Sequence, residues 1–176
     1  LDDRSSGKRS ALIDELLDTE AFSMRMFNYF SDLLRVREGL TMGGSDLKTD
    51  PYIEWIKQCV KDNKPYDSMV REMITAEGNL WDNPAGGFLI TDQGMDLCNL
   101  SNTFTVFLGT EITCAQCHDH PFEDVYQIDF FRMAAFFGKL TFKAGPEVQT
   151  IRAIKSKKKE FAAAAKKAGQ NMNDLN

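Results

Sequence analysis

Cys114 and Cys117 are separated by two residues, and His118 follows the second cysteine directly, in the order C-A-Q-C-H. A C-x-x-C-H pentapeptide is typical of the segment to which a c-type haem is attached. Thiols three positions apart lie about one helical turn apart, so both can react with the two vinyl groups on one edge of a porphyrin. The next residue, an imidazole, can then bind the iron from one side. The motif predicts a haem-c domain in which Cys114 and Cys117 are the anchors and His118 is the proximal iron ligand.

Length and composition set the class of protein. The chain has 176 residues, 43% of them hydrophobic, which suits one globular domain with a buried core. Its net charge of −5 argues against a general nucleic-acid-binding protein. No apolar run is long enough to span a membrane, so we expect no transmembrane segment.

The motif also carries an expectation about where the protein works. Covalent haem attachment normally takes place outside the cytoplasm, so we expect a periplasmic or otherwise exported protein. The chain opens with Leu1 and not with methionine, which agrees with a removed signal or with a piece of a longer protein. Residues 171–176 have the polar character of a frayed or truncated end. We expect the parent polypeptide to be larger.

Apolar residues recur at helical spacing through most of the chain, and no alternating strand series is present. Proline, glycine and capping residues divide this pattern into separate helices. The spacing predicts helices over 11–17 after a Ser10 cap, about 20–38, from 50 to a break at 63–65, about 66–74, about 95–108 and 127–137. Residues 140–142 are predicted to be extended. The predicted fold is mainly α, an irregular helical haem-c domain with long loops.

Two segments depart from the regular helical pattern. Residues 77–92 are rich in Gly, Asn, Asp and Pro but also hold Trp81 and Phe88, which predicts a long loop of the type that packs over a ligand. Residues 151–168 are rich in Lys and Ala and predict a further helix. We therefore divide the chain into a helical domain over 1–145 and a Lys/Ala-rich helical tail over 146–176.

Other kinds of cysteine site share the C-x-x-C spacing. A thioredoxin-like redox site lies in a strand-rich context, which the sequence before Cys114 lacks. A structural zinc site needs four ligands, so zinc would have to recruit Cys59 or Cys98. A plain disulfide within the motif is the third alternative. Because Cys59 and Cys98 lie in apolar helical patterns, burial of each thiol is favoured over a disulfide between them.

The face of the iron opposite His118 needs a ligand, a water molecule or nothing. The candidate distal ligands are Met95 at the exit of the long loop, Met133 on the helix after the motif, and His120. His120 is close to His118 along the chain and would not easily reach the opposite face. A filled face indicates electron transfer, whereas an open one indicates a haem enzyme or a ligand sensor.

Several segments together resemble a known family. These are Phe107-Leu108-Gly109, the C-A-x-C-H-x-H-x-F core over 114–122, the aromatic-rich helix over 129–137, and the upstream segments 50–56, 64–67 and 70–72. They resemble the planctomycete- and verrucomicrobia-type cytochrome c-like domains, a family of unknown function, over roughly residues 8 to 142. The resemblance implies a large exported protein of several domains, with Cys114, Cys117 and His118 as the haem residues. It also implies that His120 belongs to the family pattern.

Taken together, the sequence predicts an exported c-type cytochrome domain that binds one covalent haem and carries electrons to an unidentified redox partner. Catalysis is left open, although no arrangement of Ser, His and Asp supports hydrolysis, because both histidines lie in one short loop. The alternatives are a haem enzyme or ligand sensor with an open distal face, and a structural module with a disulfide or zinc at the C-x-x-C.

Overall fold

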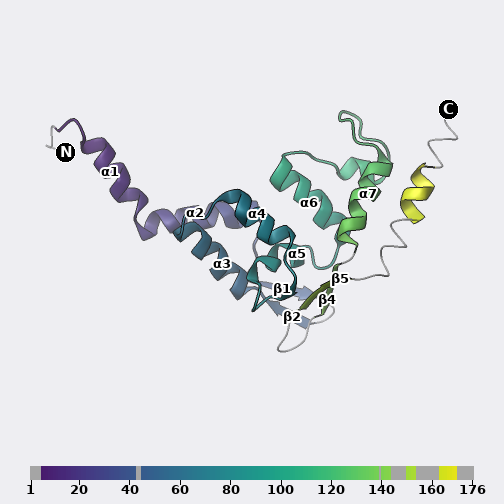
Figure 1. Cartoon of the computed structure of the whole chain (residues 1–176), viewed down its shortest axis with the longest axis horizontal. Coiled ribbons are helices and arrows are strands. Elements are labelled where there is room, and N and C mark those ends of the chain that lie inside the picture. Colours follow the sequence, from purple (N-terminus) through teal and green to yellow (C-terminus); the bar gives the residue numbers. More distant parts are fainter. Residues whose placement is uncertain (1–4, 43–44, 139, 144–149, 154–162, 170–176) are drawn as a thin grey trace.

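The computed structural model describes residues 5–42, 45–138, 140–143, 150–153 and 163–169, and it is mainly helical, as the sequence predicts (Figure 1). Residues 163–169 are also helical. The named helices are α1 (Lys8–Leu17), α2 (Glu20–Leu33), α3 (Asp50–Lys61), α4 (Tyr66–Ile74), α5 (Gly87–Ile90), α6 (Asp96–Leu108) and α7 (Gln127–Phe137), and the 3₁₀ turns are η1 (Pro84–Gly86) and η2 (Thr113–Gln116). The strands are β1 (Gly39–Met42), β2 (Ser45–Lys48), β3 (Gly78–Asn79), β4 (Leu140–Lys143) and β5 (Thr150–Ala153).

Local sequence signals explain several helix ends. Pro51 occupies the first turn of α3, where its missing N–H costs no hydrogen bond. Gly109 follows α6 with a φ of 65°, the left-handed conformation that commonly ends a helix. The predicted helices over 95–108 and 127–137 are therefore confirmed as α6 and α7. The Ser10 cap is wrong, because α1 already begins at Lys8.

Residues of α3, α4 and α5, with the ends of neighbouring segments, form the first of two apolar cores. Its most deeply buried side chains, none more than 2% exposed, include Leu34, Tyr52, Ile56, Met69, Met73 and Phe88. The Tyr52 hydroxyl contacts the Met73 sulfur at 3.5 Å, and burial raises the pKa of Tyr52. Gly87 packs directly against Tyr52, where a Cβ would overlap the tyrosine ring.

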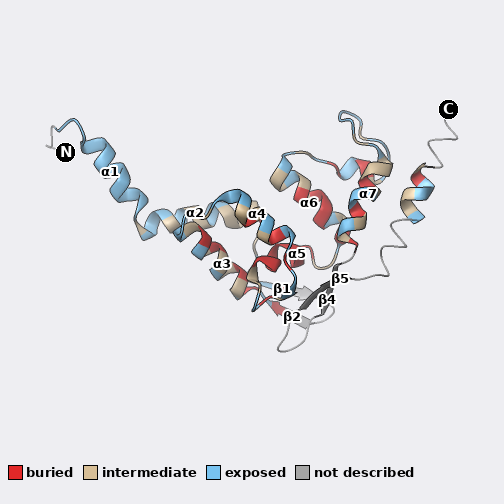
Figure 2. Cartoon of the chain, viewed as in Figure 1, coloured by how far each residue is buried: buried red, intermediate tan, exposed pale blue. Residues whose placement is uncertain are grey.

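The segment 77–92, predicted to be a long loop, belongs instead to this first core. It holds β3, η1 and α5, and residues 85–92 are buried (Figure 2). Phe88 is fully buried, whereas Trp81 is 54% exposed. Elements this short are too brief to show a helical or strand period, so the residue pattern of this buried segment is that of a loop.

Helix α2 ends at Leu33, before the predicted end at residue 38, because the chain turns at Arg35. Arg35 adopts a left-handed φ of 55°, and its guanidinium pairs with both oxygens of Asp92 at 2.5 and 3.2 Å. The Asn99 and Asn102 side-chain amides donate to the same carboxylate at 3.0 and 2.9 Å. This polar cluster joins the end of α2 to α6, and the ion pair crosses 57 positions of sequence.

The second core lies between α6, η2 and α7. Its buried members are Leu100, Ile112, Ala115, Phe130 and Ala134, each at most 1% exposed. Partly buried aromatic residues of α6 and α7, among them Phe104 and Phe131, pack against them. The cysteine motif rests on this core.

The strands form two small sheets. β1 and β2 pair as an antiparallel hairpin, and β5 lies between β3 and β4 with antiparallel pairing on both sides. The predicted extended segment 140–142 is confirmed as part of β4.

The predicted helix over 151–168 is wrong at its start, where residues 150–153 form a strand. Residues 154–162 lie outside the described residues, and residues 163–169 are helical. The boundary between 145 and 146 stays a prediction.

None of the helices in the described ranges has the length and apolar character needed to cross a membrane.

Candidate functional site

The cysteine motif forms a short turn that is anchored from beneath. Ile112 and Ala115 are buried in the second core, whereas Cys114 and Cys117 are exposed and both thiols are free. The Cys117 amide donates to the Cys114 carbonyl at 3.1 Å, and the His118 amide donates to the same carbonyl at 3.3 Å. The turn therefore presents two thiols to the surface while its own backbone is hydrogen-bonded.

His118 is exposed and held in one tautomer by its neighbour. Its Nδ1 lies 2.7 Å from the Asp119 carbonyl oxygen. A carbonyl only accepts, so in the neutral ring Nδ1 carries the proton and Nε2 keeps a lone pair. Metal-binding histidines are commonly oriented in this way, by donating the other ring N–H to a backbone carbonyl.

His120 is held in the opposite tautomer. Its Nδ1 accepts the backbone N–H groups of Glu123 at 2.9 Å and Phe122 at 3.3 Å, so in the neutral ring the proton lies on Nε2. The His120 amide also donates to the Val125 carbonyl at 2.9 Å. This ring closes the loop between the motif and α7.

Gln127, the first residue of α7, ties the motif to that helix. Its side-chain amide donates to the carbonyls of Cys117 at 2.9 Å and Gln116 at 3.3 Å. Its backbone N–H donates to the Asp119 carboxylate at 2.8 Å. Sequence reasoning missed Gln127, because its partners are backbone carbonyls about ten positions away and no spacing rule marks them.

Glu111 orders the turn from the other side and was also missed. Its carboxylate accepts the Thr113 amide at 2.9 Å, the Thr113 hydroxyl, and the Thr105 hydroxyl at 3.3 Å. The hydrogen bonds from Thr113 hold the pKa of Glu111 below its usual value, and Thr105 and His120 act in the same direction. The local signal for this was a Glu two residues before a Thr, since the Thr amide and hydroxyl can then donate to the Glu carboxylate.

The remaining cysteines do not join the motif. Cys59 is buried in the first core and Cys98 is exposed, and both thiols are free. Burial raises the pKa of Cys59 to about 11. The prediction that both thiols are buried is confirmed for Cys59 and wrong for Cys98. Within the described ranges, no three or more His, Cys, Asp or Glu side chains gather where they could hold a metal ion.

The candidate distal ligands lie apart in the sequence and are partly exposed. Met95, the residue before α6, is 54% exposed, and Met133 on α7 is 38% exposed. His120 has its Nδ1 engaged by the loop backbone, as described above. The identity of the distal ligand stays a prediction.

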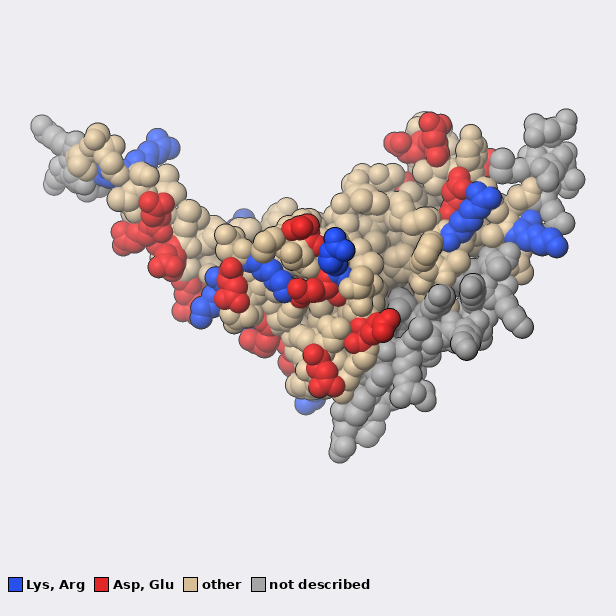
Figure 3. All heavy atoms as spheres, viewed as in Figure 1, with Lys and Arg blue, Asp and Glu red and all other residues tan. Residues whose placement is uncertain are grey.

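The surroundings of the motif are acidic and partly apolar. Between Arg71 and Arg132 the sequence has ten Asp or Glu residues and no Lys or Arg. Asp and Glu side chains gather at the tip of the molecule over the loop that precedes α7 (Figure 3). In the same loop Phe122 is 91% exposed, and Tyr126 is 47% exposed. A ligand or partner at this surface meets negative charge beside large apolar side chains.

Comparison with known proteins gives one match. No curated protein and no solved structure shows significant similarity to the chain. A family model does match, over residues 1–142, and these include α1 to α7 and the whole cysteine motif. The chain therefore belongs to the PSCyt2 family, which is described as a protein of unknown function (DUF1549).

Proposed function

We propose that this chain is an exported cytochrome c-like domain that binds one covalent haem c and transfers electrons. The observation that carries the proposal is the motif turn itself. Two exposed, free thiols lie one turn apart, and the histidine that follows them has Nδ1 bound to a carbonyl. That arrangement leaves Nε2 of His118 as a ligand for iron.

The donor set of the motif fits haem c. Each thiol of Cys114 and Cys117 can add across a vinyl group, so that a carbon–sulfur bond forms and the thiol hydrogen goes to the other vinyl carbon. This addition needs no oxidant. The imidazole of His118 is a common proximal ligand of haem iron, and bound haem supplies reversible one-electron chemistry.

The chain's own residues position the motif for this role. The Asp119 carbonyl fixes the His118 ring, and Gln127 holds the Cys117 carbonyl against α7. Ile112 and Ala115 anchor the turn in the second core. Phe122, 91% exposed in the following loop, offers apolar surface that can cover a porphyrin face and exclude water.

Covalent haem attachment tests the proposal directly. The chain is exported to a bacterial periplasm together with a cytochrome c maturation system, and the peptide that contains Cys114 is analysed by mass spectrometry. We expect one haem per chain on this peptide, and none in the Cys114→Ala/Cys117→Ala variant. Cys98→Ala is the matched control, since it removes an exposed thiol outside the motif and should leave the haem in place. An unmodified mass of the unaltered chain would contradict the proposal.

Spectra of the loaded protein separate electron transfer from the other functions. A low-spin iron that does not bind carbon monoxide supports an electron carrier with a filled distal face. A high-spin iron that binds carbon monoxide favours a haem enzyme or a ligand sensor instead. Zinc without iron in the purified chain selects a structural module. In the loaded protein, Met95→Ala and Met133→Ala test the two methionines as distal ligands.

A further inference from the structure

Helix α1 carries apolar side chains that the described part of the chain does not cover. None of its ten residues is buried, and Leu12, Ile13, Leu16 and Leu17 are each 47–54% exposed. The helix projects away from both cores, and its ribbon is exposed along its whole length (Figures 1 and 2). An isolated helix of this length is marginal in water, so a covering surface is needed to stabilise it.

The order of basic and acidic residues along α1 is the reverse of the order that stabilises a single helix. Lys8 and Arg9 lie at the beginning, and Asp14 and Glu15 lie toward the end, followed by Asp18 and Glu20. The first turn has no acidic residue and the last turn has no basic one. The helix dipole favours acidic residues at the beginning and basic residues at the end. Two antiparallel copies of α1 would place each basic end beside an acidic end, so the helix is complementary to itself.

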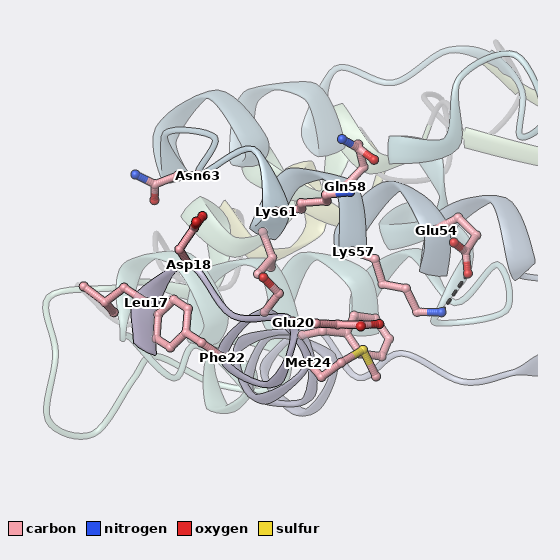
Figure 4. Close-up of a pocket in the computed structure, with 13 residues that line it drawn as sticks. Leu17, Asp18, Glu20, Phe22, Met24, Glu54, Lys57, Gln58, Lys61 and Asn63 are labelled. Atoms are coloured by element: carbon pink, nitrogen blue, oxygen red, sulfur yellow. Dashed lines mark hydrogen bonds and ion pairs between the residues drawn. The ribbon is translucent and has the colours of Figure 1, made fainter. Parts of the chain in front are cut away.

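A groove lies at the base of α1, where the incoming end of a second copy would arrive. It has a volume of about 970 Å³ and lies between the α1–α2 corner and α3. Leu17, Asp18 and Phe22 line one end, and the Lys57–Glu54 ion pair lies at the other (Figure 4). The groove thus combines apolar side chains with the carboxylates of Asp18 and Glu20 and with the amine of Lys61 on α3.

The face of α1 that would enter the groove matches this lining. Arg9, Leu12 and Leu16 are spaced by three and four positions, so they share one face of the helix. In an antiparallel arrangement, the leucines of one copy meet the apolar stripe of the other. Arg9 then lies beside the carboxylates of Asp18 and Glu20 in the other copy.

We propose that a second copy of this chain docks on α1, with the two α1 helices antiparallel and the beginning of each in the groove at the base of the other. The interface is isologous, because the same residues contribute from both copies. It is independent of the haem, since it lies on α1, α2 and α3 and uses no residue of the motif.

The mass of the full chain in solution, measured by light scattering or sedimentation over a range of concentrations, tests this interface. We expect a dimer, and a monomer for Leu12→Glu/Leu16→Glu. Phe136→Glu is the control, because it places a charge on an apolar side chain of α7 that is even more exposed, at 74%, and should leave the dimer intact. A chain that is monomeric at all concentrations, or a dimer that survives the α1 substitutions, would overturn the proposal.

A charge exchange tests the antiparallel orientation and keeps the leucines intact. Arg9→Glu alone, or Asp18→Arg/Glu20→Arg alone, places like charges together at both ends of the interface and should weaken the dimer by about tenfold or more. An equimolar mixture of the two variants restores opposite charges at both ends, so a heterodimer should form at the original affinity. Circular dichroism checks that each variant keeps its helices. A mixture that dimerises no better than either variant alone contradicts the arrangement.

Discussion

At the scale of single residues, the two histidines of the loop have different roles, although the sequence places them only two positions apart. His118 keeps its Nε2 lone pair, whereas His120 uses Nδ1 to accept two backbone amides. The motif alone predicts His118 as an iron ligand, because that prediction depends only on the residue type after the second cysteine. The role of His120 depends on the path of the loop back to α7, and no local residue pattern predicts that path.

His120→Ala tests this difference in the chain without haem. Removal of the imidazole leaves the Phe122 and Glu123 amides without their acceptor, and each hydrogen bond contributes about 1 kcal/mol. We therefore expect these two amides to exchange with solvent about fivefold faster, measured by NMR. His118→Ala is the control and should leave both amides protected, since its ring hydrogen-bonds to the Asp119 carbonyl and not to these amides. Unchanged exchange in His120→Ala would show that another group closes the loop.

The hydrogen bonds to Glu111 make a second prediction at this scale. The pKa of Glu111 is lowered mainly by Thr113, so Thr113→Val should raise it toward 4.5, the ordinary value of the carboxyl. Thr110→Val, which removes a hydroxyl that donates to the Leu108 carbonyl, should not change it. Because the folded-state pKa is lowered, this group stabilises the fold above the unfolded pKa and loses that effect as the pH falls through the folded value. An NMR titration of the carboxyl carbon measures both variants, and equal shifts in the two would refute the assignment to Thr113.

At the scale of elements, regular helices were predictable and their irregular neighbours were not. α6 and α7 follow from apolar spacing and a terminal glycine, and both lie where the pattern placed them. The sequence predicts α2 to about residue 38, but the helix stops at Leu33 because Arg35 turns to meet Asp92 far along the chain. Residues 85–92 enter the core because Gly87 lets the backbone approach Tyr52. Each of these exceptions depends on a distant partner, which a local pattern does not contain.

The contact between α5 and α3 therefore rests on the absence of a side chain at one position. Gly87→Ala keeps the helical backbone but places a Cβ within the ring of Tyr52, which is 1% exposed and cannot move outward freely. Overpacking of this kind costs about 1–3 kcal/mol of unfolding free energy. Gly39→Ala is the control, since its nearest neighbour would lie at an ordinary 3.8 Å. Urea denaturation measures both variants, and equal stability in the two would show that Tyr52 gives way.

At the scale of the whole molecule, the described part of the chain has two apolar cores, and a buried polar cluster lies between them. The first core holds the α3–α5 helices, and the second carries the cysteine motif. Asp92 lies on the segment that connects them and accepts hydrogen bonds from Arg35 on one side and from Asn99 and Asn102 on the other. Phe107 of α6 also packs against the rings of Phe88 in the first core and Tyr66 of α4, with ring centroids 4.9 and 6.4 Å away. The Asp92 carboxylate and this aromatic contact together position the motif relative to the first core.

Loss of the Asp92 carboxylate should weaken the coupling between the two cores and also lower the stability of the fold. The Asp92 side chain is only 7% exposed, so Asp92→Asn leaves Arg35 without its charge partner and should lower the unfolding free energy by about 2–4 kcal/mol. Asp129→Asn breaks an exposed ion pair with Arg132 on α7 and should cost at most about 0.5 kcal/mol. Trp55 packs against the first core, and the other tryptophan, Trp81, lies in the 77–92 segment that belongs to the same core. Tryptophan fluorescence therefore reports the first core, whereas circular dichroism reports both. If the cluster couples the cores, the two signals coincide in urea for the unaltered chain and separate for Asp92→Asn. Coincident transitions in the variant would mean that apolar contacts alone hold the motif in place.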